Sequence, residues 1–120
     1  HAPSIPETNN MFNKDNIPLL KDGAILINTA RGAIIDEEAL IAELRTGRIF
    51  AALDVTEPEP PVLDHPFRSL PNVILLPHIA GAVNNGLGRL GEHVASELER
   101  FFNGEELATE VKAEELARLA

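Results

Sequence analysis

The stretch LINTARGAIIDEEAL, residues 26–40, decides the fold. Its apolar start predicts the end of a buried strand, and Asp36 followed by two glutamates predicts the first turn of a helix. Between them stands Arg31, next to a glycine, at the point where the strand should end. Because an arginine is costly to bury without a partner, the site must offer Arg31 an anion, a carboxylate or water.

Strands and helices alternate on both sides of this stretch. A proline-rich loop, TEPEPPVLDHPFRSLP, separates the second strand from the third. The expected elements are a strand over 24–28 buried on both faces, a helix over 37–46 with Asp36 as N-cap, a second buried strand over 50–55 and a third strand over 72–77. This order predicts an α/β fold with a parallel sheet and right-handed crossovers.

The two ends of the chain are less regular. Residues 1–12 read as a loop, and residues 13–23 predict a short or irregular helix with Asn13 as a possible N-cap. A long helix is expected from about Asn84 to Asn103, closed by Gly104. Its single apolar face would consist of Val83, Leu87, Leu90, Val94, Leu98 and Phe101. The tail after Gly104 is helix-prone but has few bulky apolar groups.

Composition restricts the class of protein. A chain of 120 residues has room for one domain with a real core. Its net charge of −9 argues against nucleic-acid binding, although solubility alone explains the charge equally well. The absence of cysteine excludes disulfides and thiolate metal sites, and no apolar run is long enough to span a membrane. We expect a cytoplasmic protein without nucleic-acid or membrane partners and, since it begins without Met, a piece of a longer one.

Three chemically useful residues follow the three expected strands. In parallel sheets, ligands bind beyond the carboxyl ends of the strands. Arg31, Asp54 and His78 all fall at or just past such ends, so neighbouring strands would bring them to one rim. A glutamate from the proline-rich loop, Glu57 or Glu59, could join them.

This combination suits the reduction of a 2-oxo acid. A carboxylate on one ring nitrogen of His78 would fix its tautomer, so that the other nitrogen exchanges a proton with a carbonyl oxygen. An arginine fork would hold the substrate carboxylate with two parallel hydrogen bonds. No side chain supplies a hydride, so a nicotinamide cofactor would be required.

Each of these residues also has an ordinary structural explanation. Arg31 could cap a strand end in solvent, His78 could be a structural histidine, and glutamates in a proline-rich loop are usually solvated. Asp54 is harder to dismiss, because a carboxylate at the end of an apolar strand needs hydrogen-bond donors. The remaining histidines show no metal-ligand spacing, so no metal site is expected; they are His1, His65 and His93.

Four segments of the chain resemble the D-isomer-specific 2-hydroxyacid dehydrogenases, which include phosphoglycerate, glycerate and glyoxylate/hydroxypyruvate enzymes. These segments are HAPSIPET, LINTARGAIIDEEALIAELRTGRIFAALDV, EPEPP and NVILLPHIAG. The resemblance runs from His1 to about Asn103. It implies that residues 1–82 are the C-terminal half of a Rossmann-like NAD(P)-binding domain, a doubly wound parallel sheet. Residues 83–120 would be a long crossing helix and a return segment toward the substrate domain.

The resemblance also implies roles for individual residues. Arg31 matches the arginine that holds the substrate carboxylate, and His78 matches the acid/base histidine. Glu59 matches the partner glutamate, with Glu57 as the runner-up. The implied cofactor contacts are Ala2 and Pro3 near the adenosine side, Thr29, Ala30 and Asp54 near the nicotinamide, Gly81 in the turn behind the ring, and His78 itself.

Part of the family pattern is absent from these 120 residues, namely the first βαβ unit with its glycine-rich phosphate turn. We therefore expect the chain alone to be inactive, and the strand over 24–28 to expose an apolar edge that invites association.

The substrate and the choice between NAD and NADP stay open, and the parent protein is expected to be a homodimer. Two alternatives remain: a non-catalytic, cofactor-sensing protein resembling a corepressor, and an inactive truncated fragment.

Overall fold

The computed structural model describes residues 2–81 and 84–119. Their contacts divide them into two compact units, the first ending at Ile79 and the second formed by Ala80–Leu119. Within the described residues, no helix has the length and apolar character needed to cross a bilayer. The domain boundary expected between residues 82 and 83 lies outside the described residues.

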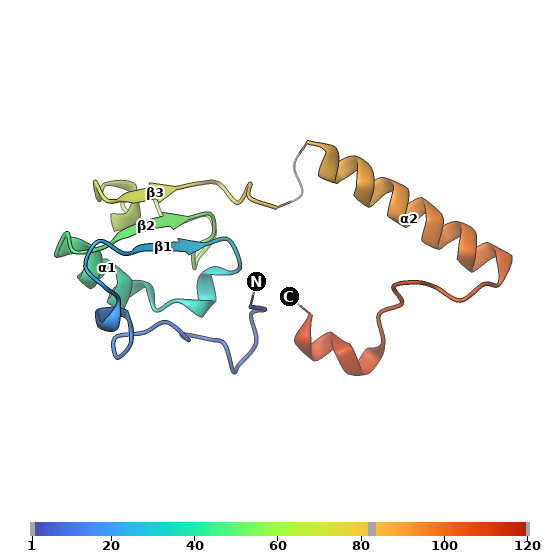
Figure 1. Ribbon diagram of the computed structural model, residues 1–120, viewed down its shortest axis with the longest axis horizontal. Coiled ribbons are helices and arrows are strands. Elements are labelled where there is room, and N and C mark those ends of the chain that lie inside the picture. Colours follow the sequence, from blue (N-terminus) through green and yellow to red (C-terminus); the bar gives the residue numbers. More distant parts are fainter. Residues whose placement is uncertain (1, 82–83, 120) are drawn as a thin grey trace. The chain divides into compact units, whose positions relative to one another are not determined.

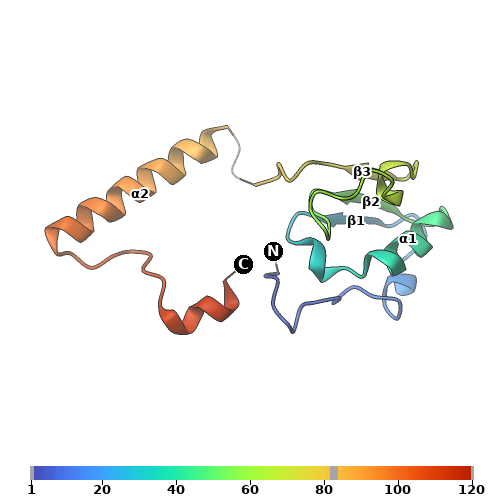
Figure 2. The same ribbon diagram turned by 180° about the vertical axis from the view of Figure 1, so that it is seen from behind.

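A parallel three-stranded sheet forms the centre of the first unit. Its strands lie in the order β1 (Ile25–Asn28), β2 (Phe50–Leu53) and β3 (Val73–Leu75). The helix α1 (Glu37–Arg45) connects β1 to β2 and lies on one side of the sheet (Figure 1; from behind in Figure 2). The predicted α/β class and the parallel sheet are confirmed, and each strand is shorter than expected.

The helix α1 begins where the sequence predicts. Asp36 is its N-cap, and its side chain accepts a hydrogen bond of 3.1 Å from the backbone N–H of Ala39. Two glutamates occupy the first turn and Arg45 the last, which complements the helix dipole at both ends. Leu40 and Leu44 are buried on the face toward the sheet.

Replacement of Asp36 by alanine should lower the free energy of unfolding by about 1 kcal/mol, because the Ala39 N–H loses its acceptor. Asp36→Asn is the matched control, since asparagine caps a helix about as well as aspartate. Denaturant unfolding followed by circular dichroism measures both variants. Equal losses in the two variants would contradict the capping role.

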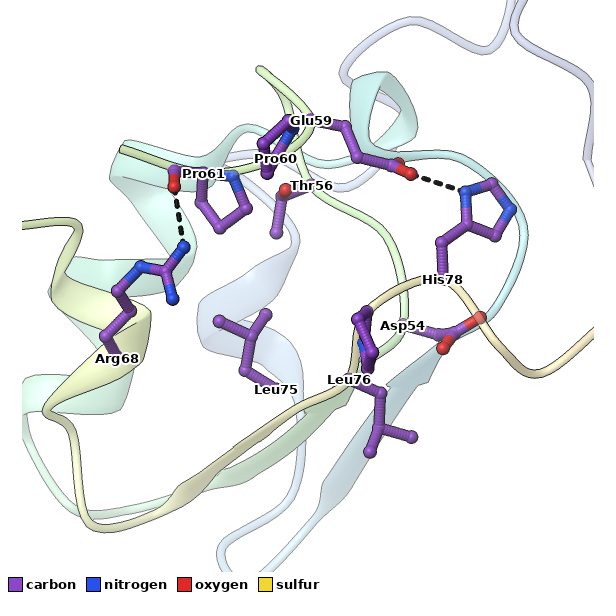
Figure 3. A pocket seen from close by; sticks show the side chains of 10 residues that line it. Asp54, Thr56, Glu59, Pro60, Pro61, Arg68, Leu75, Leu76 and His78 are labelled. Carbon is purple, nitrogen blue, oxygen red and sulfur yellow. Dashed lines mark hydrogen bonds and ion pairs between the residues drawn. The ribbon is translucent and has the colours of Figure 1, made fainter. Parts of the chain in front are cut away.

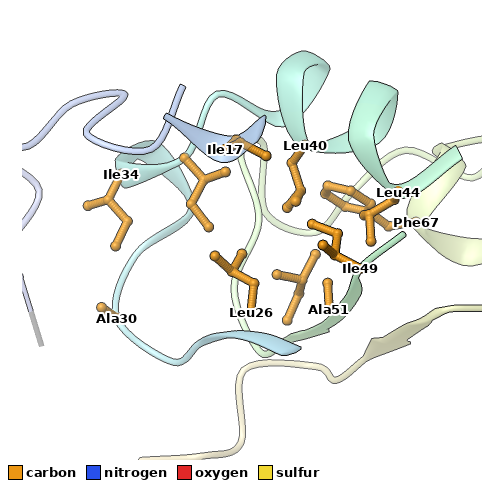
Figure 4. Packing of buried hydrophobic residues seen from close by; sticks show 11 residues of the cluster. Ile17, Leu26, Ala30, Ile34, Leu40, Leu44, Ile49, Ala51 and Phe67 are labelled. Atoms are coloured by element: carbon orange, nitrogen blue, oxygen red, sulfur yellow. The ribbon is translucent and has the colours of Figure 1, made fainter. Parts of the chain in front are cut away.

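The hydrophobic core lies between α1 and one face of the sheet (Figure 4). Two short 3-10 helices contribute to this layer, with Ile17 from Ile17–Leu19 and Phe67 from Pro66–Arg68. The first of them follows Asn16, so the expectation that Asn13 is the N-cap is wrong. The core residues are Ile17, Leu26, Ala30, Ile34, Ile35, Leu40, Leu44, Ile49, Ala51, Leu53 and Phe67.

The expectation that β1 is buried on both faces is wrong. Leu26 and Asn28 are buried, whereas Ile25 and Ile27 are 66% and 69% exposed. The reason is the period of two in a strand: alternate side chains point to opposite faces, and α1 covers only one of them. β1 is also an edge strand, because within the described sheet it pairs only with β2. The sequence-based prediction of association through this edge stays a prediction.

The second unit contains the expected long helix. This helix, α2 (Asn85–Asn103), ends at Gly104, whose φ of 69° is the left-handed conformation that glycine adopts readily. Its apolar stripe is more than half exposed at Leu87, Leu90, Val94, Leu98 and Phe101. Val83, the first expected member of the stripe, lies outside the described residues. Among the described tail residues, 105–119, the helical segment is a 3-10 helix, Ala113–Arg118.

Candidate active site

The register of the sheet aligns the carboxyl ends of its three strands. Asn28 of β1 lies opposite Leu53 of β2, and Leu53 lies opposite Leu75 of β3. Arg31, Asp54 and His78 follow these positions by three, one and three residues. Since neighbouring strands are about 4.8 Å apart, the segments after β1 and β3 leave the sheet roughly 10 Å from each other. All three residues therefore follow the same edge of the sheet.

His78 and Glu59 form a pair at this edge. His78 Nδ1 lies 2.5 Å from Glu59 Oε1, and each side chain is less than half exposed (Figure 3). An ionised carboxylate only accepts hydrogen bonds, so Nδ1 carries the proton in this pair. The other ring nitrogen, Nε2, then remains for exchange of a proton with a ligand.

The backbone at His78 has an unusual conformation. Its φ of 54° lies in the left-handed region, which costs of order 1 kcal/mol or more for a residue with a side chain. Asp54 stabilises this turn, because its Oδ1 accepts a 2.8 Å hydrogen bond from the backbone N–H of Ile79. Asp54 is only 3% exposed, and its own N–H donates to the carbonyl of Asn28. Through its carboxylate and its backbone N–H, Asp54 thus connects the ends of all three strands.

A cavity of about 330 Å³ opens beside the pair. Asp54, Glu59 and His78 line it, and Leu75 and Leu76 supply part of its apolar surface (Figure 3). A cavity with an apolar wall and a few convergent polar groups is typical of small-molecule sites. Arg31 does not line this cavity.

Arg31 projects from the tight turn that follows β1. Its Nη1 donates a 2.7 Å hydrogen bond to the carbonyl of Ala30. The buried Asn28 holds this turn from both sides: its Oδ1 accepts from Ala30 N–H at 3.0 Å, and its Nδ2 donates to the Arg31 carbonyl at 2.9 Å. The arginine thus extends from a fixed backbone, with a side chain that is partly exposed.

Gly32 explains why a glycine follows the arginine. A Cβ atom at this position would lie 2.2 Å from the backbone carbonyl carbon and oxygen of Thr56 and 2.7 Å from the backbone nitrogen of Glu57. Only a residue without a side chain allows the Arg31 turn to approach the loop that carries Glu59. The two segments that carry the arginine and the glutamate therefore touch directly.

The structure distinguishes between the two candidate glutamates. Glu59 is the one whose side chain reaches His78. The backbone N–H of Glu57 instead donates a 2.9 Å hydrogen bond to Glu37 Oε1. Sequence patterns did not single out Asn28, Gly32 or Glu37 as site residues. Of these, Asn28 carried a signal as a polar residue that ends an apolar strand, and Gly32 carried one as the glycine beside Arg31.

The remaining expected cofactor residues differ in their surroundings. Ala30 is buried and Thr29 is exposed at the turn after β1. Ala2 and Pro3 are partly buried, and the Pro3 carbonyl accepts a hydrogen bond from the Thr8 hydroxyl. Gly81 belongs to the second unit and is exposed.

Comparison with known proteins gives consistent matches. Residues 1–80 match the family model described as D-isomer specific 2-hydroxyacid dehydrogenase, NAD binding domain. A mitochondrial formate dehydrogenase of Hordeum vulgare is 40% identical over 121 residues, which cover 98% of this chain and 32% of that protein. A glyoxylate reductase of Thermofilum pendens is 42% identical over 106 residues, covering 88% of this chain and 31% of that protein.

A solved structure shows the same fold. The D-isomer specific 2-hydroxyacid dehydrogenase from Xanthobacter autotrophicus Py2, in complex with NADPH and MES, superposes with a TM-score of 0.78 at 36% identity. The match covers 92% of this chain and 45% of that one. The three parallel strands and helix α1 are thus part of a Rossmann-like domain. The chain spans about a third of the length of the curated relatives it matches.

Proposed function

Because the chain belongs to the D-isomer specific 2-hydroxyacid dehydrogenase family, we propose that it is part of an oxidoreductase that moves a hydride between a nicotinamide and a 2-oxo or 2-hydroxy acid. Residues 1–82 would be the C-terminal half of the cofactor domain, and residues 83–120 the helix and return segment toward the substrate domain. The experiments use the whole polypeptide, which is the complete protein of which this chain would be a part. The 120 residues alone are expected to be inactive, because they lack the glycine-rich turn that holds pyrophosphate.

The observation that carries this proposal is the His78–Glu59 pair at the carboxyl edge of a parallel sheet. Reduction of a carbonyl needs a proton as well as a hydride. In the proposed reaction His78 Nε2 gives that proton to the carbonyl oxygen, and Glu59 stabilises the imidazolium before the transfer. In the reverse direction the same nitrogen takes the proton from the hydroxyl group.

Arg31 would hold the carboxylate of the substrate. Its guanidinium bonds only to a nearby carbonyl in the described contacts, and it extends from a turn fixed by Asn28. A carboxylate that displaces this contact gains two parallel, charge-assisted hydrogen bonds. Because the backbone of this turn is already fixed, binding requires no further ordering of the backbone.

The residues at the rim fit the nicotinamide end of the cofactor. A carboxamide donates two hydrogens, and the carboxylate of Asp54 at the end of β2 is an acceptor of the kind it needs. Thr29 and the small Ala30 would border the ring, with Gly81 behind it and Ala2 and Pro3 on the adenosine side. When bound, NAD or NADP supplies the hydride.

The His78–Glu59 pair also favours a 2-oxo acid over formate, the substrate in the name of one relative. Oxidation of formate to carbon dioxide releases a hydride and no hydroxyl proton, so it needs no acid/base group. An imidazole held by a carboxylate is useful only when an oxygen gains or loses a proton. The substrate class is therefore the 2-oxo and 2-hydroxy acids.

The direct test supplies the whole polypeptide with NADH or NADPH and glyoxylate, hydroxypyruvate or phosphohydroxypyruvate, and follows the loss of absorbance of the reduced cofactor. Saturable turnover with one of these acids supports the proposal. Cofactor binding without turnover would support the cofactor-sensing alternative, and binding of neither would point to an assembly role. Light scattering on the same sample tests the expected homodimer.

A further inference from the structure

The loop that carries Glu59 is anchored at both ends by side chains outside the His78–Glu59 pair. On one side, Arg68 donates a hydrogen bond to the carbonyl of Pro61 at 2.8 Å (Figure 3) and another to the carbonyl of Val62 at 3.0 Å. On the other side, the backbone N–H of Glu57 donates to Glu37 Oε1 at 2.9 Å. Glu59 lies between these two anchors.

Glu37 is itself fixed on two sides. It is the first residue of α1, and its second oxygen, Oε2, lies 3.1 Å from His65 Nε2. His65 Nδ1 accepts a hydrogen bond from the backbone N–H of Phe67, so Nε2 carries the proton and donates it to Glu37. The side chains of Glu37 and His65 are only 14% and 11% exposed.

The surroundings of the Glu37 carboxylate disfavour its charged form. Burial raises the pKa of Glu37, and the hydrogen bonds from the Glu57 backbone and from His65 oppose that shift only in part. Neighbouring Glu57 adds a small repulsion that raises the same pKa. A largely buried carboxylate needs hydrogen bonds that offset the cost of burial, and one of the two bonds that Glu37 makes is the bond to the loop.

We propose that Glu37, oriented by His65, is a positioning residue that fixes the loop through Glu57 N–H so that Glu59 meets His78. The inference rests on the proposed function, because it assigns Glu37 a role in the same reaction. Glu37 touches neither His78 nor the cavity, and it acts only through the loop. Its loss should therefore affect proton transfer and leave the binding of the substrate carboxylate by Arg31 intact.

The first test compares Glu37→Ala with Glu37→Gln and Glu38→Ala in the whole polypeptide. Glu37→Ala should lower kcat on the order of 10-fold with little change in KM, since a misplacement of about 1 Å can cost up to about 100-fold. Glutamine keeps an oxygen for Glu57 N–H and should restore most of the rate. Glu38 lies on the same turn of α1, and none of the described hydrogen bonds joins it to the loop that carries Glu59. The kcat of Glu38→Ala should therefore match that of the wild type. A Glu37→Ala enzyme with wild-type kcat overturns the proposal.

A double-mutant cycle separates positioning from a general loss of structure. In a Glu59→Ala background, Glu37→Ala should change kcat by less than about twofold, because the residue it positions is gone. An equal loss in both backgrounds means that Glu37 acts on the fold alone and overturns the proposal.

A measurement without turnover distinguishes this proposal from the proposed function. The ¹⁵N signal of His78 Nδ1 reports its bond to Glu59, and Glu37→Ala should move it toward its position in Glu59→Gln. Wild-type protein that reduces no 2-oxo acid contradicts the proposed function, whereas an unmoved His78 signal in Glu37→Ala contradicts the positioning role.

Discussion

Replacement of His78 by asparagine should slow the reduction of a 2-oxo acid by about 10²- to 10⁴-fold in the whole polypeptide, the usual contribution of a general acid. Asparagine is the informative replacement because His78 has a φ of 54°, and asparagine tolerates the left-handed region better than most residues. The turn that Asp54 holds through Ile79 N–H should therefore persist. Stopped-flow measurement of NADH oxidation gives the rate of the chemical step.

The control for this variant is His93→Asn. His93 lies on α2, is exposed and bonds to the Thr109 hydroxyl, so its loss should leave turnover unchanged. The KM for the 2-oxo acid should change little in His78→Asn, since the proposed carboxylate site at Arg31 is unchanged. If the turnover of His78→Asn stays within about twofold of the wild type, His78 is not the general acid of the reaction.

Replacement of Gly32 by alanine should have the largest effect on stability, a loss of more than about 3 kcal/mol or failure to fold. The added Cβ would lie 2.2 Å from the backbone of the buried Thr56. Since the obstacle is backbone rather than a flexible side-chain end, relief requires the turn after β1 and the Glu59 loop to separate. Denaturant unfolding of the 120-residue chain, with tryptic cleavage as a second probe, measures the loss.

Gly88→Ala is the matched control for this prediction. Gly88 lies within α2 and an added Cβ meets nothing within 4 Å, so alanine should stabilise the helix by about 0.5–1 kcal/mol. If the denaturant midpoint of Gly32→Ala equals that of the wild type, the close contact between the Arg31 turn and the loop that carries Glu59 is not a feature of the folded protein.

The sequence predicted those features that depend on local pattern. The parallel strands, the Asp36 cap and the end of α2 at Gly104 follow from hydrophobic period and capping chemistry, and all three are present. The rim shared by Arg31, Asp54 and His78 follows from topology once the strands are parallel.

Other features depend on contacts between distant segments, which no local pattern encodes. The need for glycine at position 32 arises from the Thr56 backbone, 24 residues further along the chain. The hydrogen bond from Glu57 to Glu37 spans 20 residues, and Glu37 attracts no notice in the first turn of a helix, where acids are common. The open face of β1 was missed because an apolar run alone does not say how many layers cover it.

The most direct test of the central claim asks whether Arg31 and His78 bind one small acid together. Oxamate, a 2-oxo acid analogue that is not reduced, would be titrated into the whole polypeptide with NADH present while the ¹⁵N side-chain signals of both residues are recorded. We predict that both sets of signals shift with a single midpoint, and that Arg31→Ala abolishes the response of His78. Response of only one residue in the wild type, or two separate midpoints, would contradict the account.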